Sequence, residues 1–122
     1  MRFILSVLVF AAIMGTATPA AATMRTDELL WKCRGEDQPP MIGVSACIGF
    51  VSGFIDAFAL IDGMTEGRTR FFCLPGRGIS NDQAIRIFIK WANEHPGDLH
   101  TTARTTLMLA LANTFPCSAP RK

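Results

Sequence analysis

Four cysteines, Cys33, Cys47, Cys73 and Cys117, place the strongest constraint on how this chain of 122 residues folds. Their number is even, and their spacing contains no Cys-x-x-Cys motif. The spacing therefore indicates neither a zinc knuckle nor a thioredoxin-like redox centre. Whether the cysteines pair as disulfides depends on the compartment in which the protein folds.

The N-terminal segment answers that question. Arg2 is followed by an apolar run over residues 3–14, broken only by Ser6, and small residues then lead to Ala22. A helix that spans a bilayer needs about 20 apolar residues, so this shorter run is typical of a secretory signal peptide. We expect cleavage after Ala22, which gives a signal peptide at 1–22 and a mature domain at 23–122. An uncleaved membrane anchor is the alternative.

Composition narrows the class of protein further. Hydrophobic residues make up 49% of the chain and charged residues 18%, a balance that supports a packed core and excludes a disordered chain. The formal net charge is only +2, which gives no reason to expect nucleic-acid binding. The length fits one domain.

Local patterns predict four helices. The first covers residues 26–33, with Thr26 as its cap and Gly35 as its stop. The second is strongly apolar and runs from Ser45 to about residue 63, after a loop that contains two prolines. Ser80 begins a capping box for the third, and Asp98 begins the fourth, which ends near residue 115. No segment alternates with a period of two, so we expect an all-α domain.

The helical stripes predict which side chains are buried. The expected core consists of Ile48, Val51, Ile55, Phe88, Ile89, Leu107 and Leu111. In the second helix, Ser45, Gly49, Gly53 and Ala57 form a ridge of small side chains. Such a ridge predicts close approach of another backbone, either within the subunit or at a dimer contact. Asp56, the one charge inside this helix, is expected to be buried and satisfied by an arginine or a backbone amide.

The predicted helices favour one of the three disulfide connectivities that four cysteines allow. Cys33–Cys47 would tie the first helix to the start of the second. Cys73–Cys117 would tie the middle loop to the C-terminal segment. A free nucleophilic cysteine is the alternative, and an exported chain with an even number of cysteines disfavours it.

No group of side chains forms a catalytic or metal-binding pattern. Glu94, His95, Asp98 and His100 lie close together in sequence. However, the spacing of the two histidines matches neither i+3 nor i+4, and a Pro-Gly break separates them. The Gly-Arg-Gly segment at 76–78 lacks the features of a phosphate-binding loop. We therefore predict no catalytic residue, no metal and no cofactor.

Three segments together resemble one family. Residues 46–57 carry the pattern Cys-x-Gly-aromatic-x-x-Gly-x-x-Asp, residues 72–83 carry a Cys-x-Pro turn and a helix cap, and residues 95–117 resemble the closing helix. In this order they are similar to the Rap/Tai family of type VI secretion immunity proteins. The resemblance implies a periplasmic helical protein, often dimeric, that blocks a toxic peptidoglycan amidase and needs no catalytic residues.

An inhibitor of this kind needs an exposed surface that recognises its toxin. Loops commonly carry recognition, so we expect the contact to come from residues 62–70 and 76–80. The candidate partner-binding residues are Glu66, Arg68, Arg70 and Arg77. Two rival functions remain: a general envelope stress or chaperone-like protein that holds clients on apolar surface, and a small periplasmic enzyme that uses His95 or His100.

Overall fold

The computed structural model describes residues 23–68 and 70–118, which form four α-helices and one short 3-10 turn. The elements are α2 (Thr26–Cys33), α3 (Pro40–Met64), α4 (Asn81–Glu94), η1 (Pro96–Asp98) and α5 (Ala103–Thr114). Within these residues the only β feature is an isolated bridge between Arg25 and Thr102. The predicted all-α fold with four helices is confirmed, and the predicted signal peptide at 1–22 lies outside the described residues.

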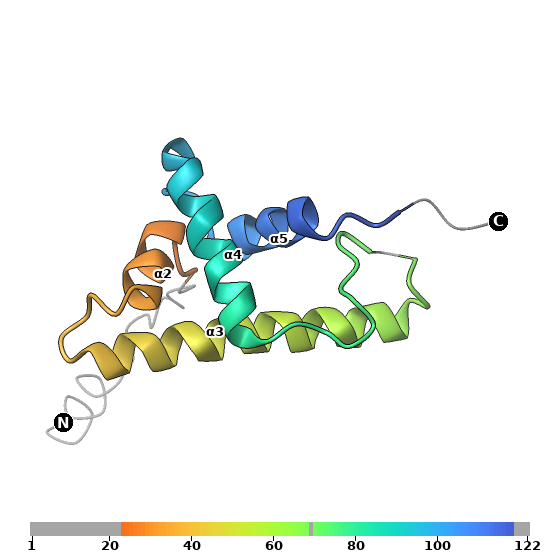
Figure 1. Ribbon diagram of the computed structural model, residues 1–122, viewed down its shortest axis with the longest axis horizontal. Coiled ribbons are helices and arrows are strands. Elements are labelled where there is room, and N and C mark those ends of the chain that lie inside the picture. Colours follow the sequence, from red (N-terminus) through yellow and green to blue (C-terminus); the bar gives the residue numbers. More distant parts are fainter. Residues whose placement is uncertain (1–22, 69, 119–122) are drawn as a thin grey trace, which may run out of the picture.

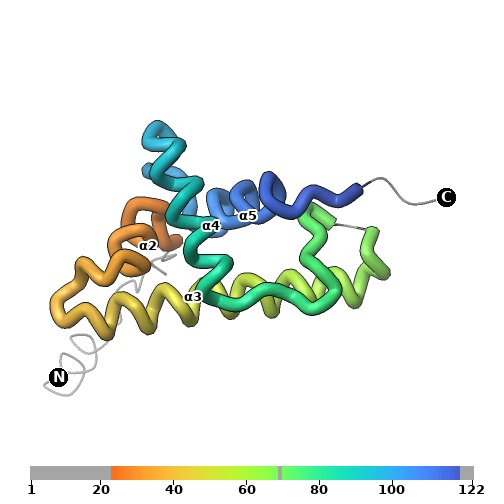
Figure 2. Tube along the Cα trace, viewed as in Figure 1, coloured from red at the N-terminus to blue at the C-terminus, as the bar shows by residue number. Residues whose placement is uncertain are grey.

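The long helix α3 is the base of the domain (Figure 1). Helices α2 and α5 lie on one side of it, and α4 crosses steeply between them, contacting α2, α3 and α5. The tube view shows the segment between α3 and α4 leaving the far end of α3 and running back along it (Figure 2). Helices α2 and α4 therefore pack directly on α3, whereas α5 packs mainly on α4 and α2.

The start of α2 differs from the prediction. Arg25 occupies the cap position, and Thr26 is the first helical residue and is buried. The hydroxyl of Thr26 lies 2.7 Å from that of Thr106 and donates to the backbone oxygen of Thr101. The prediction that Thr26 caps α2 was therefore wrong. Its side chain instead connects the start of α2 with residues 101 and 106, which are distant in sequence. Gly35 follows the helix with a φ of 70°, as expected of a stop.

Helix α3 begins at Pro40, five residues before the predicted start at Ser45. The sequence argument treated the prolines as helix breakers. Proline is nevertheless favoured at the first helical position, where its fixed φ suits the helix and its missing N–H has no partner to lose. The prediction that the loop reaches residue 45 is corrected accordingly.

The ends of the last two helices show one success and one error. Ser80 caps α4 as predicted, accepting a hydrogen bond of 3.1 Å from the backbone N–H of Gln83. Helix α5 begins at Ala103, not at Asp98. The intervening backbone pairs with the start of α2: Thr26 N–H donates to Thr101, and Ala103 N–H donates to Met24. These bonds satisfy helix-terminal amides and fix where α5 starts.

The core lies between α3, α4 and α5 and also includes the inner face of α2. Its fully buried large side chains are Leu29, Val51, Phe88, Leu107 and Leu111. The core prediction is confirmed for Val51, Phe88, Leu107 and Leu111, and Ile55 and Ile89 pack partly buried against this cluster.

Two predictions of burial on α3 were wrong. Ile48 is 41% exposed, and Asp56 is exposed as well. Asp56 lies opposite the side of α3 that carries Cys47 and Val51, whereas Ile48 lies at the edge of that side, in an open hollow next to the start of α4. Asp56 therefore needs no buried counter-charge, because its carboxylate is in contact with solvent.

Two disulfides hold these elements together, with the predicted connectivity. Cys33–Cys47 joins the end of α2 to α3, and Cys73–Cys117 joins the returning segment to the chain beyond α5. The described residues contain no free cysteine. Both pairings are confirmed, so the alternative of a reactive thiol does not apply.

Candidate protein-binding site

The segment between α3 and α4 contains the residues predicted to bind a partner. Helix α3 continues to Met64, so residues 62–64 are helical and the loop begins at Thr65. Glu66 and Gly67 have φ angles of 52° and 74°, and the N–H of Gly67 donates to the backbone oxygen of Asp62. Two successive residues in the left-handed region turn the chain sharply away from the helix axis. Glycine is suited to the second position because a side chain there would be strained.

The returning part of this loop is anchored by aromatic packing. Phe72 is 5% exposed and stacks on Phe58 of α3 with ring centroids 4.3 Å apart. Phe54 completes the cluster, with its ring 5.9 Å from Phe58 and 6.4 Å from Phe72. Aromatic pairs at these separations are favourable beyond the area that they bury. The cluster fixes the loop against the second half of α3.

A second anchor ties the same segment to the C-terminal end of the domain. Cys73 is bonded to Cys117, and its N–H donates to the backbone oxygen of Phe115 at 2.9 Å. The loop thus leaves α3, packs back onto α3 and is attached to the chain beyond α5. Its base is rigid while its tip faces solvent.

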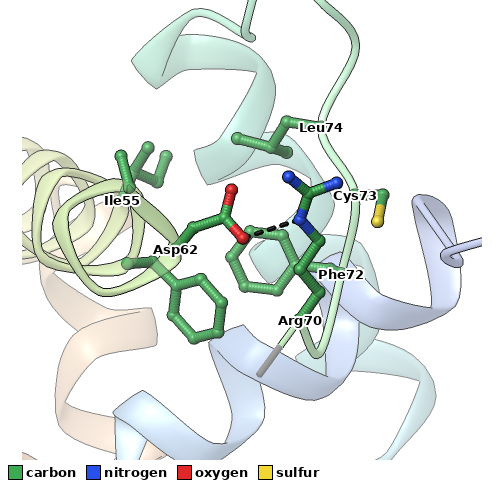
Figure 3. A pocket seen from close by; sticks show the side chains of 8 residues that line it. Ile55, Asp62, Arg70, Phe72, Cys73 and Leu74 are labelled. Atoms are coloured by element: carbon green, nitrogen blue, oxygen red, sulfur yellow. Dashed lines mark hydrogen bonds and ion pairs between the residues drawn. The ribbon is translucent and has the colours of Figure 1, made fainter. Parts of the chain in front are cut away.

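Arg70 has a more constrained role than the sequence argument assigned to it. Its Nε donates to Asp62 Oδ1 at 2.6 Å, and this bond and the charge of Asp62 raise the pKa of the guanidinium above its usual value. The side chain also crosses Gly67, where an added Cβ would come within 2.9 Å of three guanidinium atoms. Figure 3 shows the pair between the end of α3 and the returning chain. Arg70 therefore closes the loop and is only half exposed.

The other three predicted contact residues are well exposed. Glu66 and Arg68 form an ion pair at 3.3 Å, yet their side chains are 81% and 78% exposed. Arg77 is exposed in a separate turn, closed by a bond from Gly78 N–H to the backbone oxygen of Pro75. Glu66, Arg68 and Arg70 lie together in one turn. Arg77 lies in a second turn of the same loop, on the segment that returns toward α4.

The outer face of α3 is a second exposed surface, and it carries the ridge of small side chains that the sequence predicts to lie against another backbone. The ridge formed by Ser45, Gly49, Gly53 and Ala57 is exposed, and a Cβ added at either glycine would meet nothing within 4 Å. The prediction that this ridge packs against another backbone of the same subunit was therefore wrong. A dimer contact through this ridge stays a prediction.

Large apolar side chains continue this outer face toward both ends of the helix. Met41 and Ile42 at one end, and Leu60 and Met64 at the other, are between 64% and 76% exposed. By length and composition alone, α3 is the one described helix that could cross a membrane. Contiguous exposed apolar side chains of this kind are common at surfaces that bind proteins or membranes.

His95, one of the two histidines considered above as catalytic candidates, is held in place by contacts with Trp91. The ring of His95 stacks on Trp91 with centroids 3.9 Å apart, and its Nδ1 donates to the backbone oxygen of Trp91. His100 is exposed. Among residues 23–68 and 70–118, no group of three or more His, Cys, Asp or Glu side chains is placed to hold a metal ion.

Comparison with known proteins identifies the family of the chain. The family model described as Rap1a immunity proteins matches residues 25–117, which include all four helices and both disulfides. No curated protein and no solved structure is significantly similar to the chain. Because the match covers most of the sequence, the chain belongs to the family of Rap1a immunity proteins.

Proposed function

We propose that this immunity protein acts in the periplasm, where it binds a peptidoglycan amidase delivered by a type VI secretion system and occludes its active-site cleft. The observation that carries this proposal is the anchored loop at residues 65–78. Its base is held by the aromatic cluster, by Cys73–Cys117 and by the Asp62–Arg70 pair. A preorganised loop loses little conformational entropy when it enters a cleft, which favours tight binding.

The exposed charges of the loop are the proposed contacts. Glu66, Arg68 and Arg77 can form charge-assisted hydrogen bonds with the toxin, and Arg70 in addition holds the loop in shape through its bond to Asp62. Within the loop, arginines outnumber acidic residues by three to one. The loop is therefore suited to an acidic surface around the toxin's cleft.

The proposed signal peptide and the two disulfides support a periplasmic location. The proposed signal peptide at 1–22 would direct the chain to the periplasm, and the mature domain at 23–122 retains every cysteine. Disulfides persist in that compartment, and both pairs are formed in the fold. The protein would thus reside where a peptidoglycan-cleaving toxin acts.

Co-expression tests the proposal directly. Cells that export a cognate peptidoglycan amidase, sought among those that the host encodes, should survive when the protein is also exported, and should lyse without it. The triple variant E66A, R68A, R77A should fold normally and lose protection, while the matched variant R86A, E94A, K90A on exposed positions of α4 should keep it. Lysis despite abundant folded protein, for every amidase that the host encodes, would refute the immunity proposal.

We further propose that the outer face of α3 is covered by a second copy of the chain. The pattern of the face is similar in both directions, with large side chains near Met41 and Met64 and small ones at Gly49 and Gly53. A two-fold contact requires such self-complementarity. Antiparallel α3 helices centred between residues 52 and 53 would separate the two Asp56 carboxylates by about 10 Å along the axis, so like charges would not meet.

Sedimentation equilibrium distinguishes this dimer from the chaperone-like alternative. The mature protein should have twice its chain mass, and G53R should be monomeric, because two arginines would face each other at the axis. The control G97R, at another exposed glycine with open space around it, should remain dimeric. A monomeric wild type that binds unfolded clients through this face would favour the chaperone-like function instead.

A further inference from the structure

An open pocket of about 210 Å³ lies beside the loop base, on the side of α3 opposite its outer face (Figure 3). Ile55, Phe58 and Asp62 line it from α3, where their spacing of three and four residues puts them on one face. The returning segment contributes Arg70, Phe72 and Leu74. The pocket therefore lies beside the aromatic cluster and the Cys73–Cys117 disulfide, the two anchors that fix the loop.

The floor of this pocket is apolar and rigid. Phe58 and Phe72 stack at 4.3 Å, and Cys73 beside them is fixed by its disulfide. Ile55 and Leu74 are only partly buried, so they offer apolar surface to an entering group. The volume and lining suit one aromatic or branched aliphatic side chain.

The rim of the pocket is polar and has one cation. Arg70 uses Nε for its bond to Asp62, and in Figure 3 its terminal nitrogens lie toward Leu74. A guanidinium has five N–H donors, so one carboxylate bonded at Nε leaves donors for a second. Arg70 is half exposed, which makes those donors accessible from solvent. An incoming carboxylate can therefore bind at the rim while an apolar group fills the floor.

We propose that this pocket binds an acidic segment of the partner protein, placing an apolar side chain against Phe58 and Phe72 and a neighbouring carboxylate on Arg70. The partner is the toxin, so the inference rests on the proposed function. The three arginines and one glutamate of residues 65–78 provide the complementary charge. Asp62 limits the strength of this contact because it competes for the same guanidinium.

A titration with small molecules tests the pocket without the toxin. Amide NMR spectra of the mature disulfide-bonded protein would be recorded with 3-phenylpropionate, with its neutral amide, and with acetate. The acid should shift resonances of Phe58, Phe72 and Leu74 and bind about tenfold more tightly than the amide, as expected of charge-assisted hydrogen bonds. Acetate, which lacks the ring, should cause no comparable shifts.

Two variants separate ligand binding from loop support. R70Q should abolish the preference for the acid over the amide, whereas D62N should strengthen binding of the acid because it removes the competing carboxylate. If the pair served only to hold the loop, both variants would have the same effect. Equal binding of acid and amide, shifts outside the pocket, or weaker acid binding by D62N would each overturn the inference. Since no toxin is used, such a result is distinct from a failure to protect cells.

Discussion

Removing the disulfide between Cys73 and Cys117 would test how the loop is held. This disulfide closes a loop of 44 residues, and the variant C73A, C117A leaves that loop open in the unfolded chain. The chain-entropy relation gives a loss of about 4 kcal/mol in the free energy of unfolding for a loop of this length. For the 14-residue loop of Cys33–Cys47 the same relation gives about 3 kcal/mol.

Urea denaturation followed by far-ultraviolet circular dichroism would measure this loss. The double variant should keep its helical signal in buffer and unfold at a lower urea concentration than the wild type. Because Cys117 is exposed, truncating that side chain adds little of its own, so the change reports mainly the cross-link. A loss below about 1 kcal/mol would show that the aromatic cluster and the Cys73–Phe115 hydrogen bond fix the segment without the disulfide.

Three further predictions concern the core and the helix ends. F88A should lower the free energy of unfolding by about 3–5 kcal/mol, because Phe88 is fully buried; a nearly unchanged urea midpoint would contradict this packing. T106V should cost about 1 kcal/mol by removing the hydroxyl bonded to Thr26, whereas T105V, at an exposed position on the same helix, should have a smaller effect. The hydrogen bond from Arg25 lowers the pKa of the Asp27 carboxyl below its usual value, so the stabilisation from this pair is present at neutral pH and is lost as pH falls through the lowered pKa. R25Q should raise the pKa of Asp27, measured by carboxyl NMR titration, and an unchanged pKa would exclude Arg25 as the cause.

Local signals predicted the helices well where one strong cue decided the outcome. Ser80 and Gln83 mark the start of α4, and the stripe containing Phe88 marks its buried face. The starts of α3 and α5 needed more information. Pro40 is compatible both with a loop and with a first helical position. The start of α5 is fixed by backbone pairing between Ala103 and Met24, which are distant in sequence.

The candidate binding loop could likewise be predicted only in part, because some of its contacts depend on residues that the fold brings together. The polar, glycine-rich composition of residues 62–70 indicated an exposed loop; residues 62–64 are helical, but Glu66 and Arg68 are exposed in the loop as predicted. The pairing of Arg70 with Asp62 was missed because it depends on how sharply the chain turns after α3. Periodicity showed the ridge at Gly49 and Gly53, but the pattern is the same whether the subunit or another molecule covers it. Only the fold shows that the domain leaves this face open.

Inhibition of a purified amidase is the most direct test of the central claim. Each peptidoglycan amidase that the host encodes would be assayed for release of peptide from isolated peptidoglycan while the mature immunity protein is added in increasing amounts. Hydrolysis should stop near one immunity subunit per amidase, and the variant E66A, R68A, R77A should be needed in large excess. Full hydrolysis of peptidoglycan by every such amidase at a large excess of folded wild-type protein would show that the protein is not an amidase inhibitor.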